Sequence, residues 1–197
     1  MIVPVNARFH PHLCLPRVMR AAVLIALSLG GLSATAHAQS SAGAHVHGQA
    51  RLDLTIEGRT LRIEAELPME TLTGFERAPR TDDERRRLDR ALETVRLATL
   101  FRPSVDAGCK PTAQTYRWSG SSDSAPGVAA LPADESHTDL LLTHEFECER
   151  PAKLGSIDIG LFEAFSRLRR IEARVAGPSG TQARTLQRSR RVLEVSR

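Results

Sequence analysis

Apolar and polar residues alternate from His45 to Ile56 and again from Thr60 to Leu67. Each alternation predicts a strand with one buried face, and Gly58-Arg59 between them suits a two-residue hairpin turn of the II′ type. We therefore expect an antiparallel hairpin, which Pro68 ends. Pairing Glu57 with Thr60 puts the apolar side chains of both strands on one face, with Ile56 opposite Leu61, Leu54 opposite Ile63 and Leu52 opposite Ala65.

An irregular stretch, Met69 to Pro79, follows the hairpin and leads to a predicted helix. Thr81 and Glu84 have the spacing of a capping box, which opens a helix. The three arginines at 85–87 lie near its start, where we interpret them as a solvated face; a short patch for phosphate or membrane is the alternative. Apolar residues recur at helical spacing at Leu88, Leu92, Val95 and Ala98.

The remainder of the chain is typical of a sheet. Residues 109–118 and 138–149 predict two strands, and residues 119–136 between them are rich in Ser, Ala, Gly, Pro and Asp, which predicts a flexible surface loop. The fold class is therefore α+β: an antiparallel β-sheet with one main amphipathic helix. Shorter extended segments are predicted at Ser156–Leu161, Ile171–Ala176 and Gln182–Gln187, with a turn at Gly177-Pro178-Ser179-Gly180.

The first 38 residues have the three parts of a secretory signal peptide. These are a positive n-region without acidic residues, an apolar run from Ala21 to Leu32, and a small-x-small cleavage site at Ala36-His37-Ala38. The apolar run is shorter than the roughly 20 residues that span a bilayer; an uncleaved anchor is the alternative. We expect a periplasmic location and one mature domain over 39–197 without a transmembrane segment.

Cleavage of residues 1–38 would change the charge balance of the chain. The full sequence has 27 basic and 23 acidic residues, and three of the arginines precede Ala38, so the mature part is nearly neutral. Aromatic residues make up only 4% of the chain. Neither property favours nucleic-acid binding.

Two cysteines, Cys109 and Cys148, belong to the mature part. An even pair in an oxidising compartment predicts one disulfide that staples the domain. Closing a loop of this length would stabilise the fold by about 4 kcal/mol in the chain-entropy model. A thiolate pair on a metal ion is the alternative, although the C-x-x-C spacing of zinc sites is absent.

The four mature histidines divide into a chelating pair and two single residues. His45 and His47 are two positions apart in a predicted strand, so both rings leave one face; imidazoles in this arrangement suit zinc, copper or nickel. In the strand at 138–149, His144 shares the apolar face and is expected in the core. His137 and Asp139 share the opposite face and can join the first pair.

The hairpin register also brings carboxylates towards the chelating pair. His47 lies opposite position 70 when the pairing is continued, so Glu70 and Glu76 are within reach. Three histidines with one carboxylate suit tetrahedral zinc. The predicted ligands are His45, His47 and His137, with Glu76 or Asp139 supplying oxygen.

Several motifs together resemble the ZrgA-like periplasmic zinc-uptake accessory proteins. His45-Val46-His47-Gly48 is followed by Gly74-Phe75-Glu76-x-Ala78-Pro79, and His137-x-Asp139 precedes the second cysteine. The likeness continues through Pro151-x-x-Leu154 and Gly160-Leu161-Phe162-x-x-Phe165 and covers nearly the whole mature chain. Two positions depart from the family: Arg77 replaces a histidine that members often carry, and residues 119–136 contain no histidine.

The resemblance implies a non-enzymatic periplasmic protein that binds Zn²⁺ in support of high-affinity zinc uptake and zinc homeostasis. Its partners would be the zinc ion and a zinc ABC importer or that importer's periplasmic binding protein. Two other hypotheses stay open. One is an envelope protein-interaction module with incidental histidines. The other is a metallohydrolase with Glu145 or Glu76 as base, although no H-E-x-x-H signature appears.

Overall fold

The computed structural model describes residues 47–121, 131 and 138–195, all of which belong to one compact unit spanning 43–197. Strands β1 (Gln49–Glu57) and β2 (Thr60–Pro68) form the predicted antiparallel hairpin. Glu57 pairs with Thr60, as expected, and the remaining predicted pairs follow in the same register. Gly58 has a φ of 57°, whereas Arg59 has a negative φ, as a II′ turn requires.

Two helices follow the hairpin, where the sequence predicts one. The short helix α2 (Met69–Thr73) replaces the first part of the expected irregular stretch. Helix α3 (Asp82–Val95) is the predicted amphipathic helix, and it begins at the expected capping box. The Thr81 side chain accepts a hydrogen bond from the Glu84 N–H, and the Glu84 carboxylate accepts one from the Thr81 N–H.

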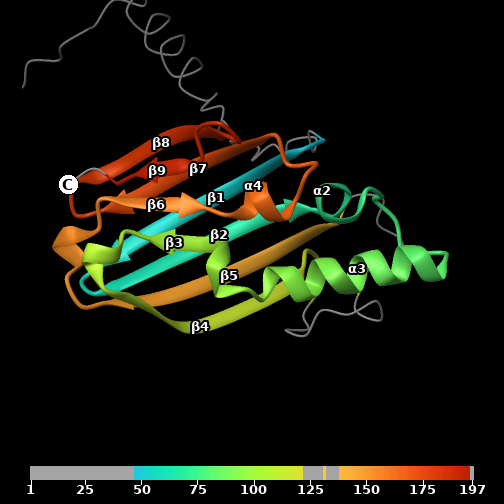
Figure 1. Cartoon of the computed structure of the whole chain (residues 1–197), viewed down its shortest axis with the longest axis horizontal. Coiled ribbons are helices and arrows are strands. Elements are labelled where there is room, and N and C mark those ends of the chain that lie inside the picture. The colour runs from blue at the N-terminus through green and yellow to red at the C-terminus, as the bar shows by residue number, and fades with distance from the viewer. Residues whose placement is uncertain (1–46, 122–130, 132–137, 196–197) are drawn as a thin grey trace, which may run out of the picture. The chain divides into compact units, whose positions relative to one another are not determined.

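The remaining strands complete two sheets (Figure 1). The larger sheet has the strand order β4-β5-β2-β1-β7-β8, and the smaller sheet has the order β3-β6-β9. Short 3₁₀ turns lie at Ala98–Leu100, Val105–Ala107 and Pro151–Lys153. The other elements are β3 (Phe101–Pro103), β4 (Cys109–Trp118), β5 (Asp139–Cys148), β6 (Ser156–Ile159), α4 (Leu161–Ala164), β7 (Arg170–Gly177), β8 (Gly180–Gln187) and β9 (Val192–Glu194).

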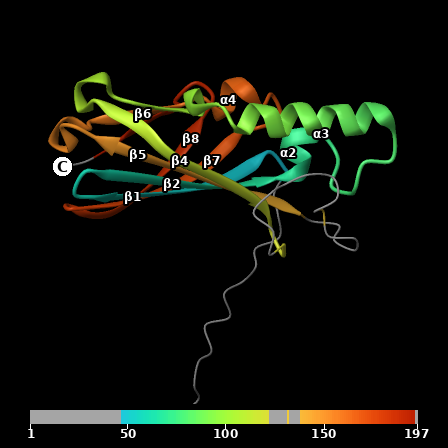
Figure 2. The same cartoon turned by 90° about the horizontal axis from the view of Figure 1, so that it is seen from below.

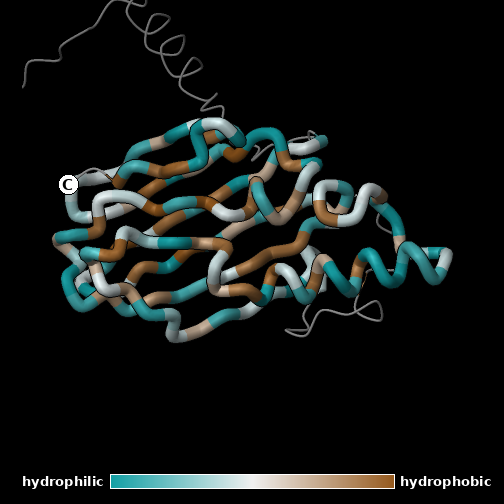
Figure 3. The backbone as a smooth tube through the Cα atoms, in the orientation of Figure 1, coloured by the Kyte–Doolittle hydropathy of each residue, from teal (hydrophilic) through white to brown (hydrophobic). Residues whose placement is uncertain are grey.

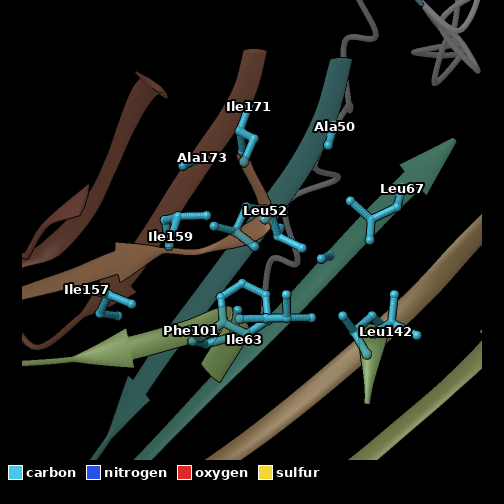
Figure 4. Packing of buried hydrophobic residues seen from close by; sticks show 14 of the residues in the cluster. Ala50, Leu52, Ile63, Leu67, Phe101, Leu142, Ile157, Ile159, Ile171 and Ala173 are labelled. Carbon is cyan, nitrogen blue, oxygen red and sulfur yellow. The ribbon is translucent and has the colours of Figure 1, made fainter. Parts of the chain in front are cut away.

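The small sheet and the helices cover one face of the large sheet, as the turned view shows for α3, α4 and β6 (Figure 2). Phe101 of β3 and Ile159 of β6 lie against Leu52 and Ile63 of the large sheet (Figure 4). The alternating hydropathy of β1, β2, β5 and β7 follows from this arrangement, because these inner strands of the large sheet bury alternate side chains over most of their length (Figure 3). The core therefore lies between the two sheets.

The disulfide joins Cys109 and Cys148, which are directly paired on neighbouring strands β4 and β5. This confirms the predicted staple and excludes free thiolates at these positions as metal ligands. The bridge lies at the end of β5 that is furthest from Asp139. It holds the outer strand β4 to the sheet where a bulge between Pro111 and Ala113 interrupts the pairing.

The structure confirms the α+β class with one main amphipathic helix, and it refines three details. Strand β1 begins at Gln49 rather than at His45, because the chain turns at His47 and Gly48. The sheet is antiparallel except for the parallel pair β1 and β7. Most of the predicted loop at 119–136, and the whole predicted signal peptide, lie outside the described residues.

Candidate metal site

His47 lies in a turn that leads into β1, rather than in the strand itself. Gly48 has a φ of 72°, a conformation that favours glycine. Its carbonyl oxygen accepts hydrogen bonds from the N–H groups of Arg169 (2.8 Å) and Arg170 (3.1 Å), at the start of β7. A Cβ atom at Gly48 would lie 2.8 Å from the Arg167 carbonyl oxygen. The backbone that carries His47 is thus fixed against the α4–β7 connection.

Helix α2 lies at the end of the large sheet where β1 begins (Figure 1). Glu70 belongs to this helix, and Glu76 follows it. The Met69 N–H donates to the Thr138 carbonyl oxygen at 2.9 Å, which fixes the start of the helix beside the start of β5. Glu70 therefore has a defined position in the first turn. The helix ends at Gly74, whose φ of 91° reverses the chain and places Glu76 near Glu70 and His47.

One imidazole nitrogen faces both carboxylates. His47 Nδ1 lies 3.5 Å from Glu70 Oε2 and 3.5 Å from Glu76 Oε1. The His47 side chain is 69% exposed, whereas those of Glu70 and Glu76 are 21% and 31% exposed. Glu70 Oε2 is itself buried, and among the described residues it has no hydrogen-bond partner. A buried carboxylate oxygen without a donor is costly, so this arrangement is suited to receiving a cation.

The donor types at this position fit zinc, which is commonly held by imidazole nitrogen and carboxylate oxygen. Within the described parts of the chain, however, no group of three or more His, Cys, Asp or Glu side chains is already arranged to hold a metal ion. The predicted ligands His45 and His137 lie outside the described residues. His47 and Glu76, both predicted from the sequence, do lie together.

Asp139, the alternative oxygen ligand, is at the first position of β5 and is 5% exposed. Its N–H donates to Ser119 Oγ at 3.0 Å, and its carbonyl oxygen accepts from the Ser119 N–H at 2.8 Å. It pairs with Pro68, two residues before Glu70. Strand β2 therefore lies between Asp139 and the strand that follows the His47 turn, and the backbone of Asp139 is fixed by the contacts with Ser119.

His144 is a core residue, as the strand parity predicts. It is 1% exposed, and its ring meets that of Phe101 edge-on with centroids 5.1 Å apart. Burial lowers the pKa of His144, although a hydrogen bond to the Val95 backbone acts in the opposite direction. Among the described residues, Nε2 has no hydrogen-bond partner.

The Arg77 side chain contacts the start of α3 and the ring of Phe75. Its guanidinium donates to both carboxylate oxygens of Glu84, at 2.7 and 3.0 Å, and lies 5.7 Å from the Phe75 ring centroid. Together with backbone hydrogen bonds from Arg80 and Thr81, this contact lowers the pKa of Glu84 to about 2. Arg77 thus ties the segment after Gly74 to the start of α3.

The basic cluster at 85–87 is partly neutralised. The Arg85 and Arg86 guanidinium groups form ion pairs with Asp82 and Asp83, one turn earlier on the helix. Paired exposed charges of this kind are typical of a solvated helix face.

Glu70 is the residue that the predicted ligand set leaves out. The hairpin register places it within reach of His47, but the pattern alone does not distinguish it from Glu76. The distinguishing signal is its place in α2, a segment for which the sequence pattern predicts no regular structure.

A profile described as ZrgA family zinc uptake protein matches residues 44–195. The chain belongs to the ZrgA family. The match begins just before the His47 turn and ends at the last described residue, so it includes the whole fold and all the groups of the candidate site. No curated relative matches this ZrgA family member. None of its described helices is long and apolar enough to cross a membrane.

Proposed function

We propose that this ZrgA family member is a periplasmic zinc-binding protein that supports high-affinity zinc uptake. The observation that carries the proposal is the position of His47 Nδ1, at 3.5 Å from one oxygen each of Glu70 and Glu76. His45 and His137 complete the proposed imidazole set, and Glu76 or Asp139 supplies oxygen. His137 directly precedes Thr138, whose carbonyl oxygen holds the start of α2.

The location in the periplasm rests on the signal-peptide pattern of residues 1–38 and on the Cys109–Cys148 disulfide. Disulfides persist in oxidising compartments and are rare in the cytosol. A zinc-binding protein in that compartment would deliver zinc to an ABC importer or to the importer's periplasmic binding protein. We assign no catalytic residue, because the candidate ligands are not accompanied by a zinc-hydrolase signature such as H-E-x-x-H.

The test is a zinc titration of the mature protein, monitored by calorimetry. It compares the wild type with a His45→Ala/His47→Ala double variant. Mass spectrometry fixes the mature N-terminus, and metal analysis of the protein as isolated identifies the bound metal. We expect stoichiometric zinc binding by the wild type and a loss of affinity of at least about tenfold in the double variant, because zinc sites depend on each protein ligand. Unchanged affinity would overturn the assignment.

A second function, docking of another envelope protein, is favoured by a different observation. The face of the large sheet away from the small sheet carries charged side chains and contains a groove of about 480 Å³. The groove is lined by residues that include Arg51, Arg62, Glu64, Arg117 and Thr143. A metal-free protein that still binds its partner, and loses that binding on Arg117→Glu substitution, would support docking rather than zinc binding as the main role.

A further inference from the structure

We propose that Glu70 is a direct ligand of the bound metal ion and that His47 coordinates the metal through Nδ1. This inference rests on the proposed zinc-binding function and adds to it one ligand and one coordinating atom. It uses only the described residues His47, Glu70 and Glu76.

The distances between the donor atoms of His47, Glu70 and Glu76 fit zinc coordination. Zinc holds imidazole nitrogen and carboxylate oxygen at about 2.0–2.2 Å in a tetrahedral arrangement, so neighbouring ligand atoms lie about 3.4 Å apart. His47 Nδ1 is 3.5 Å from Glu70 Oε2 and 3.5 Å from Glu76 Oε1. Both separations match the edge of a zinc tetrahedron with Nδ1 at one corner.

Neither contact has the length of an ordinary hydrogen bond. An N–H···O hydrogen bond spans about 2.7–3.2 Å, and neither 3.5 Å contact falls in that range. A neutral imidazole with its proton on Nδ1 has one N–H there, which cannot be directed at two carboxylates together. A metal ion at the same nitrogen can bind both oxygens.

Glu70 Oε2 is buried and has no hydrogen-bond partner in the part of the chain that the structure describes. The oxygen is shielded from solvent, and His47 Nδ1 lies 3.5 Å from it, beyond ordinary hydrogen-bond length. Binding a cation would compensate the lost hydration of the carboxylate. Glu70 is also placed by the hydrogen bond that fixes Met69, so its carboxylate needs little movement to serve as a ligand.

The three side chains do not yet form a finished centre among the described residues. The His47 ring is mostly exposed, so it is the part that can adjust most readily. Zinc would draw His47 and Glu76 onto the more buried Glu70, and a further ligand would complete the tetrahedron. Binding should therefore fix the orientation of the His47 side chain on a turn whose backbone is already held.

The decisive experiment is a long-range ¹H–¹⁵N correlation spectrum of mature protein labelled with ¹⁵N-histidine and loaded with zinc. A His47→Gln variant assigns the signals. We expect the His47 ring proton on Nε2, because Nδ1 holds the metal. A proton on Nδ1 would overturn the proposal, since Glu70 and Glu76 would then serve as hydrogen-bond acceptors that orient the ring from outside the coordination sphere.

A matched pair of variants tests Glu70 separately. Glu70→Gln keeps the shape of the side chain and removes its charge, whereas Glu57→Gln makes the same change at the exposed far end of β1, about 26 Å of extended strand away. We expect zinc affinity to fall at least about tenfold for the first and to stay unchanged for the second. Circular dichroism and thermal unfolding verify that both variants fold.

These outcomes separate the inference from the function on which it rests. If the wild type binds zinc through His47 but Glu70→Gln binds equally well, the Glu70 assignment fails and the zinc-binding function stands. If the wild type binds no zinc, the function itself fails. X-ray absorption of zinc-loaded Glu70→Gln supplies a further readout, because loss of a ligand lowers the number of oxygen neighbours around the metal.

Discussion

The Gly48 carbonyl oxygen accepts a 2.8 Å hydrogen bond from the Arg169 N–H, which connects the turn carrying His47 to the segment that enters β7. Because β1 and β7 are parallel neighbours, both strands begin at the same end of the sheet. The candidate site therefore depends on a parallel pairing between residues more than a hundred positions apart. The other half of the site, on α2, depends on the local hairpin.

Substitution of Gly48 by alanine tests this connection. Alanine at a φ of 72° is strained, and its Cβ would press against the Arg167 carbonyl oxygen at 2.8 Å. We expect a loss of stability of about 1–3 kcal/mol, together with weaker zinc binding because the His47 turn shifts. Chemical denaturation and zinc titration measure the two effects.

The control for this variant is Gly58→Ala, in the hairpin turn. Gly58 also has a positive φ, of 57°, but a Cβ atom added there would meet nothing within 4 Å, and the residue stands at the opposite end of β1. Gly58→Ala should lose stability and keep its zinc affinity. Equal losses of zinc affinity in the two variants would show that the site responds to general destabilisation.

The local hairpin could be predicted from the sequence, whereas the order of distant strands in the sheet could not. The alternation of Leu52 and Leu54 with polar neighbours defines both the strand and its buried face, so the register with β2 follows from one turn. The sequence does not indicate that β7 is the parallel partner of β1, because several apolar strands could pair with that edge of β1. The three-residue strands β3 and β9 are too short to show any alternation.

The Glu84 carboxylate makes α3 sensitive to acid. Its pKa is lowered to about 2 by Arg77 and by backbone N–H donors, whereas an unfolded glutamate titrates near 4.3. The unfolded chain therefore binds the proton more tightly, and the contribution of Glu84 to stability is present above about pH 4.5 and is lost as the pH falls towards 2. Glu84→Gln should have a shallower decline in stability across this window.

Urea denaturation at pH values from 6 to 2 measures that slope. Glu93→Gln is the matched control, because Glu93 is exposed on the same helix. Its slope should equal that of the wild type. If Glu84→Gln also retains the wild-type slope, the Arg77–Glu84 contact does not persist in solution.

The buried imidazole of His144 predicts a second pH dependence. Its pKa is lowered by burial, so the unfolded chain, with a histidine pKa near 6.5, takes up the proton first. Stability should fall as the pH decreases below about 6.5 towards the lowered folded pKa. His144→Leu removes this contribution and should reduce the loss of stability between pH 7 and 5, measured by thermal unfolding.

Zinc affinity at pH 7 is the companion measurement for His144→Leu. We expect it to match the wild type, since His144 packs against Phe101 in the core. A loss of affinity beyond about tenfold, with the fold intact, would mean that His144 and not the His47 turn contributes to the metal site.

The site was predictable only where a residue's neighbours in the chain determine its surroundings. Strand parity separates His144 from Asp139, and the hairpin register brings His47 towards Glu70. The sequence pattern does not single out Glu70, because the burial of its carboxylate oxygen depends on helix α2. A five-residue helix contains too little periodicity to be recognised in the sequence.

Removal of the disulfide should separate stability from metal binding. The Cys109→Ala/Cys148→Ala variant loses a bridge that closes a sequence separation of 39 residues, so we expect it to be less stable by about 2–4 kcal/mol. The bridge adjoins the start of β2, whereas Glu70 follows the end of that strand, about 26 Å away along extended chain. Zinc affinity should therefore stay within about twofold of the wild type when the measurement is made well below the unfolding temperature. Alanine is preferable to reduction of the wild type here, because free thiolates would add a competing zinc site. A tenfold loss of affinity in the folded variant would mean that the strand β5, whose first residue is Asp139, transmits strain from one end of the sheet to the other.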